Sequence, residues 1–175
     1  MYLKITQYKV DVYKIDCPAG WANITIDASE QQGRISIASS HGNWSNYWGH
    51  CRMPFEEFLC GINMEYAADK FGCGSYLDCG ATIQEIKRDL LELRRNNPNA
   101  ISRETARDAW EDIYSLEGID SADHFYTTYY YTETLSTILS SDCPTIHTSV
   151  HPQFEYFWES IWGHFVTYLK ENIND

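Results

Sequence analysis

The spacing of apolar residues changes at Pro54, and this change constrains the fold more than any other feature. Before Pro54, β-forming residues are interrupted by polar ones; after it, apolar residues recur every three or four positions, as in amphipathic helices. The chain therefore predicts an α+β fold, with an antiparallel sheet of three to four strands followed by about five helices packed against it. At 175 residues we expect a single domain, mainly β over 1–52 and mainly α over 53–175.

Three strands are predicted before residue 40, joined by short polar links that favour an antiparallel meander. The first is the run from residue 2 to Ile15, the second holds Trp21 to Ile26, and the third holds Ile35 and Ile37. Residues 44–48 are expected to form a fourth strand.

Five helical segments are predicted from apolar spacing and from start and stop residues. They begin at Pro54, at Thr82 with Glu85 in a capping box, at Ser102, at Ser121 and at Pro152. Glycines at 72 and 74 end the first segment, and the second stops before Pro98.

The net charge of −12 is unevenly distributed along the chain. Residues 1–52 carry +1, residues 53–100 carry −3 and residues 101–175 carry −10. A strongly acidic half repels phosphate backbones, so we expect no direct binding of nucleic acid. It suits a basic surface on a protein or nucleoprotein complex, although acidic faces also serve simply to keep a protein soluble.

The partner-binding residues that we expect are the densest carboxylates and three aromatic side chains of the fourth strand. They are Asp108, Glu111, Asp112, Glu117, Asp120, Asp123, Trp44, Tyr47 and Trp48. Tryptophan and tyrosine bury much area at small entropic cost, as binding anchors do. The alternatives are a solvated acidic face and tryptophans that belong to the core of a sheet edge.

A second hypothesis is a small enzyme with a pocket at residues 39–51, where His41, His50 and Cys51 accompany the tryptophans. Against it, the chain has no phosphate-binding glycine loop, nucleophile elbow or HExxH motif. The six cysteines lack a closely spaced pair, so we expect reduced thiols, no metal and no cofactor. A third alternative is a structural or oligomerising module, such as a homodimer.

No apolar run approaches the ~18 residues that span a bilayer. The first sixteen residues alternate in character and resemble neither a signal peptide nor an anchor. We therefore expect a soluble protein of the cytoplasm that does not bind membranes.

The stretches 33–40 (GRISIASS), 44–49 (WSNYWG), 58–63 (FLCGIN) and 66–72 (YAADKFG) resemble small accessory proteins of bacteriophages and prophages. The resemblance brings no catalytic residues and implies the cytoplasm of a bacterial host. Small acidic phage proteins often block a host machine. Our leading hypothesis is thus a non-enzymatic accessory protein that binds a basic host surface, in its sharpest form an anti-CRISPR or anti-restriction inhibitor.

Overall fold

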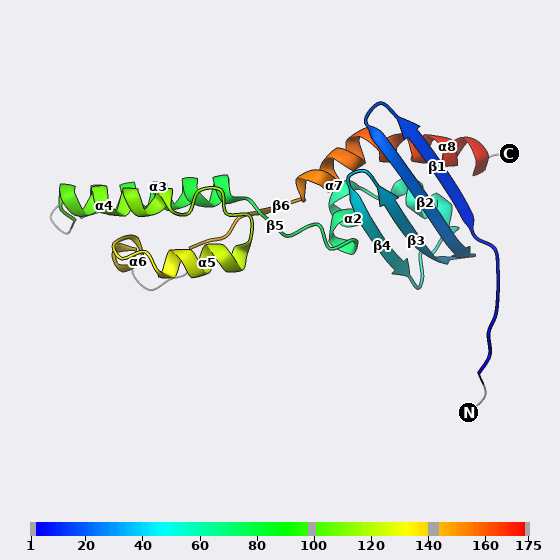
Figure 1. Ribbon diagram of the computed structural model, residues 1–175, viewed down its shortest axis with the longest axis horizontal. Helices are drawn as coiled ribbons and strands as arrows, with labels where there is room; N and C mark the ends of the chain where they lie inside the picture. Colours follow the sequence, from blue (N-terminus) through cyan, green and yellow to red (C-terminus); the bar gives the residue numbers. More distant parts are fainter. Residues whose placement is uncertain (1–2, 98–100, 140–143, 174–175) are drawn as a thin grey trace. The chain divides into compact units, whose positions relative to one another are not determined.

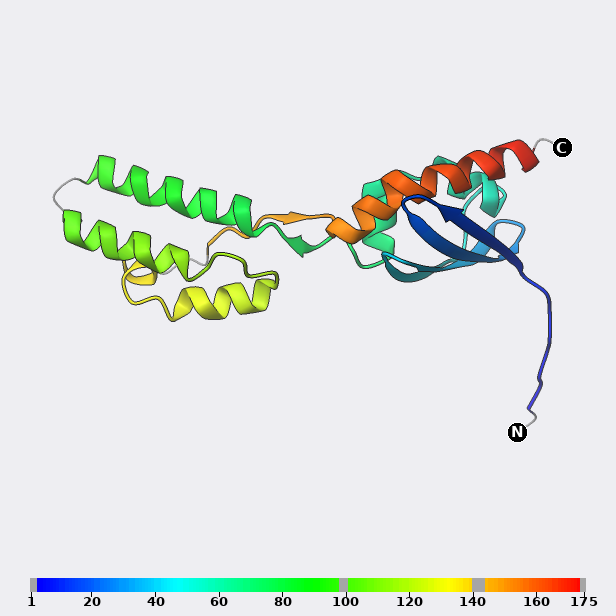
Figure 2. The same ribbon diagram turned by 45° about the horizontal axis from the view of Figure 1, so that its top comes forward.

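The computed structural model describes residues 3–97, 101–139 and 144–173 (Figures 1 and 2). The chain forms two compact units, and each is built around its own core. The first unit combines Met1–Gly74 with Val150–Asp175, and the second is Ser75–Ser149. The expectation of one domain over the whole chain stays a prediction.

The first unit contains a four-stranded antiparallel sheet in the order β1-β2-β3-β4. Its strands are β1 (Asp11–Cys17), β2 (Gly20–Ser29), β3 (Gln32–Ser39) and β4 (Gly42–Trp48). Glu30 in the turn after β2 has positive φ, as do Gly20 and Gly42, the first residues of β2 and β4, and this lets neighbouring strands join through very short links. The predicted meander is confirmed, but the first strand begins at Asp11 rather than near the start of the chain.

Alternate residues of this sheet face the core. Ile24, Ile26, Ile35 and Ile37 are at most 3% exposed, and they meet aromatic side chains from α1 (Phe55–Gly61) and from the C-terminal helix. That helix comprises α7 (Pro152–Phe157), a π-helical turn η1 (Trp158–Trp162) and α8 (Gly163–Ile173). The predicted packing of helices on the sheet is confirmed for these elements (Figure 2).

The first predicted helix is divided into α1 and α2 (Met64–Lys70). Ile62 between them is extended, with φ −74° and ψ 146°, and the side chain of Asn63 caps α2 by accepting a hydrogen bond from the amide of Tyr66 at 2.9 Å. Asparagine favours such a cap over a helix interior, so Asn63 restarts the helix in a new direction.

The second unit is mainly helical. Its helices are α3 (Cys79–Asn96), α4 (Arg103–Tyr114), α5 (Ala122–Tyr130) and α6 (Leu135–Ile138), and β5 (Tyr76–Leu77) pairs with β6 (Thr148–Ser149). Its core is formed by side chains of this unit, including Ile86, Leu90, Ile113 and Phe125. The structure describes more helices than the five predicted segments. The first segment contains α1 and α2, and the fourth, from Ser121, contains α5 and α6.

Of the predicted helix N-caps, the one at Ser102 is confirmed and the one at Thr82 is not. Ser102 caps α4 by accepting from the amide of Thr105, as expected. Ser121, the expected first residue of the fourth segment, caps α5 by accepting from the amide of His124. The predicted capping box at Thr82 is wrong: α3 begins three residues earlier, with Asp78 accepting from Ala81 at 2.8 Å. No helix within the described ranges is both long and apolar enough to cross a membrane.

Candidate functional site

The predicted acidic residues all lie in the second unit, on α4, on α5 and in the loop between them. Asp108 and Glu111 project from α4, Asp120 lies just before the cap of α5, and Asp123 lies in the first turn of α5. All four are exposed, and none forms an ion pair with another residue that the structure describes. They are therefore available to a basic partner.

The other two predicted carboxylates have partners inside the unit. The side chain of Asp112 accepts hydrogen bonds from the amides of Thr134 at 2.9 Å and Leu135 at 2.8 Å, at the start of α6. The carboxylate of Glu117 lies 3.6 Å from the ammonium group of Lys87. Both are less available for binding than the four exposed carboxylates.

The three predicted aromatic residues lie in β4 of the first unit and do not share a face. Trp44 packs against Phe154 and Phe157, with ring centroids 5.1 and 5.0 Å apart. Trp48 is 7% exposed, and its indole nitrogen donates to the hydroxyl of Tyr66 at 2.9 Å. Tyr47 points to the opposite face of the sheet and is 53% exposed, so it alone offers a largely free aromatic surface.

The residues of the enzyme hypothesis have separate environments. The imidazole Nε2 of His41 lies 3.0 Å from the carbonyl oxygen of Ala19, and the ring packs 4.9 Å from that of Tyr156. His50 is exposed, whereas burial of Cys51 raises the pKa of its thiol. A raised pKa disfavours the thiolate that a nucleophilic cysteine needs. No cluster of potential metal ligands is found in the described part of the chain.

Sequence reasoning missed a polar cluster on α3. His147 hydrogen-bonds through Nε2 to Glu85, whose other oxygen accepts from Arg88 at 2.8 Å. The backbone amide of His147 donates to the hydroxyl of the buried Thr82 at 3.0 Å. The bond from His147 lowers the pKa of Glu85. These contacts fix the segment before β6 against α3.

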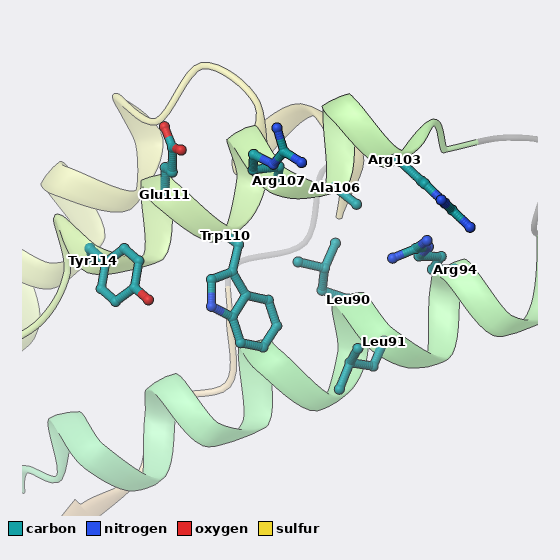
Figure 3. Close-up of a pocket in the computed structure, with 9 residues that line it drawn as sticks. All are labelled: Leu90, Leu91, Arg94, Arg103, Ala106, Arg107, Trp110, Glu111 and Tyr114. Atoms are coloured by element: carbon teal, nitrogen blue, oxygen red, sulfur yellow. The ribbon is translucent and has the colours of Figure 1, made fainter.

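A groove of about 490 Å³ between α3 and α4 was also missed (Figure 3). Arginines from both helices line it together with apolar and aromatic side chains: Arg94, Arg103, Arg107, Leu90, Leu91, Ala106, Trp110, Glu111 and Tyr114. None of the three guanidinium groups forms an ion pair with a described residue. The helical spacing of Arg103, Arg107, Trp110 and Tyr114 was the sequence signal for this face.

Comparison with known families identifies the group to which the chain is related. The model of the phage family Phage_phiTE_072 matches residues 3–171, which cover the whole second unit and most of the first. The chain belongs to this phage family. The predicted relation to phage proteins is thereby confirmed. No curated protein and no solved structure matches the chain.

The range matched by the family model, residues 3–171, contains all nine predicted partner-binding residues. It also contains every residue that lines the groove. The exposed carboxylates of α4 and α5 remain the candidate site. Exposed carboxylates that form no ion pair with a described residue are open to contacts with cations outside the unit.

Proposed function

We propose that this phage protein is a non-enzymatic binding protein whose second unit docks on a basic surface of a host protein or nucleoprotein complex. The observation that carries the proposal is the set of exposed carboxylates that form no ion pair with a described residue, namely Asp108, Glu111, Asp120 and Asp123. Segment 101–149 has nine acidic and two basic residues, and of the four carboxylates Glu111 shares the groove with the two basic residues, Arg103 and Arg107.

The sequence suggested an acidic surface over residues 101–175, and the division into units restricts it to the part that lies in the second unit. Residues 150–175 belong to the first unit, and residues 75–100 carry four acidic and four basic residues. The excess of negative charge in the second unit therefore comes from α4, α5 and their flanking loops, which supports a docking surface centred there.

A basic protein surface often exists to hold nucleic acid, and carboxylates on rigid helices can occupy it in place of phosphates. Such a binder would block a restriction or CRISPR complex by competition, without catalysis, a cofactor or direct contact with nucleic acid. An anti-defence inhibitor acting in the bacterial cytoplasm is the finer form of the proposal. Electrostatic docking speeds association and weakens as salt screens the charges.

The experiment is an affinity capture from bacterial lysate with the tagged protein at about 50 and about 500 mM NaCl, where screening lengths differ roughly threefold. We expect one nucleic-acid-handling complex to be retained at low salt and released at high salt, as read by mass spectrometry. Recovery of no specific partner, or of one held equally at both salt concentrations, would contradict the proposal.

A further inference from the structure

Residues 3–10 form an arm that leaves the sheet before β1 and extends away from it (Figures 1 and 2). Leu3, Ile5 and Tyr8 in this arm are 88, 85 and 65% exposed, the highest values among large apolar side chains described in the first unit. Because removing apolar surface from water is favourable, covering these side chains with another surface would stabilise an assembly.

The arm resembles a β-strand that has no hydrogen-bonded partner strand among the described residues. The sheet ladder begins at the pair Asp11–Ile26, and no backbone group of residues 3–10 pairs with the backbone of another described residue. The side chain of Tyr8 ties the base of the arm to the sheet by donating to Asp27 at 2.9 Å. Isoleucine, threonine, tyrosine and valine in the arm favour extended backbone.

The first unit also presents an open strand edge. β4 is the last strand of the sheet, and its outer edge forms no backbone hydrogen bond with any described residue. This seven-residue strand contains no lysine and no proline, the residues that commonly protect edges against pairing. The other edge strand, β1, carries the charged residues Asp11, Lys14 and Asp16.

The charges of the arm favour an acidic partner. All 25 acidic residues of the chain follow residue 10, whereas the arm holds Lys4 and Lys9. A basic strand is attracted to the negatively charged remainder of another copy, and each copy offers both an arm and an edge. Reciprocal exchange forms two strand pairings in one association step, a common route to two-fold symmetric dimers.

We propose that residues 3–10 add as a fifth strand to β4 of a second copy of this chain, and that the second copy does the same in return. The eight-residue arm matches the seven-residue length of β4. Because Leu3 and Ile5 are two positions apart, they fall on one face of the added strand. In the register that places Leu3 and Ile5 on the side of Trp44 and Trp48, the added strand extends the apolar face of the sheet.

The test is the mass of the full chain in solution by light scattering, with the variant Leu3→Asp/Ile5→Asp. We expect about twice the chain mass of 20.3 kDa, and a dimer dissociation constant at least tenfold higher for the variant. The matched control, Leu91→Asp/Ile173→Asp, makes the same two changes at exposed positions on α3 and α8 and should leave the dimer intact.

Amide hydrogen exchange of β4 separates strand addition from other modes of association. Exchange at Asn43, Ser45 and Tyr47 should be slower in the full chain than in Leu3→Asp/Ile5→Asp, with unchanged far-ultraviolet circular dichroism. A monomeric full chain, a dimer that survives the arm substitutions, or equal loss of the dimer in the control would each overturn the proposal.

Discussion

The carboxylate of Asp112 on α4 accepts a hydrogen bond from the backbone amide of Leu135, 2.8 Å away at the first residue of α6. The same oxygen accepts from the amide of Thr134 at 2.9 Å. One side chain thus satisfies two amides that the helix itself leaves without acceptors. Asp112 acts as a cap supplied by another helix.

Asp112→Ala is expected to lower the free energy of unfolding by about 1–2 kcal/mol, because two half-buried amides lose a charged acceptor. Urea denaturation followed by circular dichroism measures this. The control Asp108→Ala, an exposed change on the same helix, should cost less than about 0.5 kcal/mol. Equal stability of the two variants would show that the cap is not structurally important.

The contact between Glu85 and His147 predicts a pH dependence of stability. The hydrogen bond from His147 is the main cause that lowers the pKa of Glu85 in the folded chain. A carboxyl with a lowered pKa stabilises the fold above its unfolded pKa, about 4.3, and this contribution is lost as pH falls through the folded value.

Glu85→Gln should therefore have a lower Tm than the unmodified protein at pH 6, and the difference should shrink as the pH approaches 3. Thermal denaturation across this range measures it, with Glu92→Gln on the same helix as the control. A difference that stays constant with pH would contradict the assignment.

Burial raises the pKa of the thiols of Cys51, Cys60 and Cys73, chiefly by disfavouring the charged thiolate. We expect Cys51 in the native protein to react with iodoacetamide at pH 7.5 at least tenfold more slowly than in the urea-unfolded chain. Peptide mass spectrometry after timed quenching gives both rates. Faster reaction in the native state would favour the enzyme hypothesis at residues 39–51.

The groove between α3 and α4 brings like charges together, since Arg94 lies in the last turn of α3 and Arg103 in the first turn of α4. A cation at a helix N-terminus is also unfavourable. Arg103→Gln should thus raise stability by about 0.5 kcal/mol at low salt.

The gain should fade at high salt, where charges are screened. Arg95→Gln removes a cation from the last turn of α3 outside the groove and should give no gain. Thermal or urea denaturation of both variants measures the difference. A loss of stability in Arg103→Gln would mean that Arg103 has a favourable contact in the groove.

The sheet was predictable because alternation and turn residues are local signals. Ile24, Ile26, Ile35 and Ile37 face the core as their alternation indicates. The arm was assigned to the first strand because its residues are equally β-prone, and local preference cannot show that the ladder between β1 and β2 begins only at Asp11. The division at Asn63 was missed because the apolar spacing continues across it.

The site was only partly predictable. Negative charge on α4 and α5 is a property of composition, and exposure of Asp108 and Asp123 follows from helical spacing. The use of Asp112 as a cap depends on the position of α6, which no local pattern determines. The pairing of Glu85 with His147 joins residues 62 positions apart and required the fold.

The most direct test of the proposed docking surface compares two fourfold variants in the lysate capture at low salt. One variant, Asp108→Asn/Glu111→Gln/Asp120→Asn/Asp123→Asn, removes the exposed carboxylates of the second unit. The other, Glu57→Gln/Glu65→Gln/Glu155→Gln/Glu159→Gln, removes as much charge from exposed positions of the first unit. We predict that the first variant recovers at least tenfold less of the partner and the second recovers it as the unmodified protein does. Equal recovery by the two variants would contradict the account.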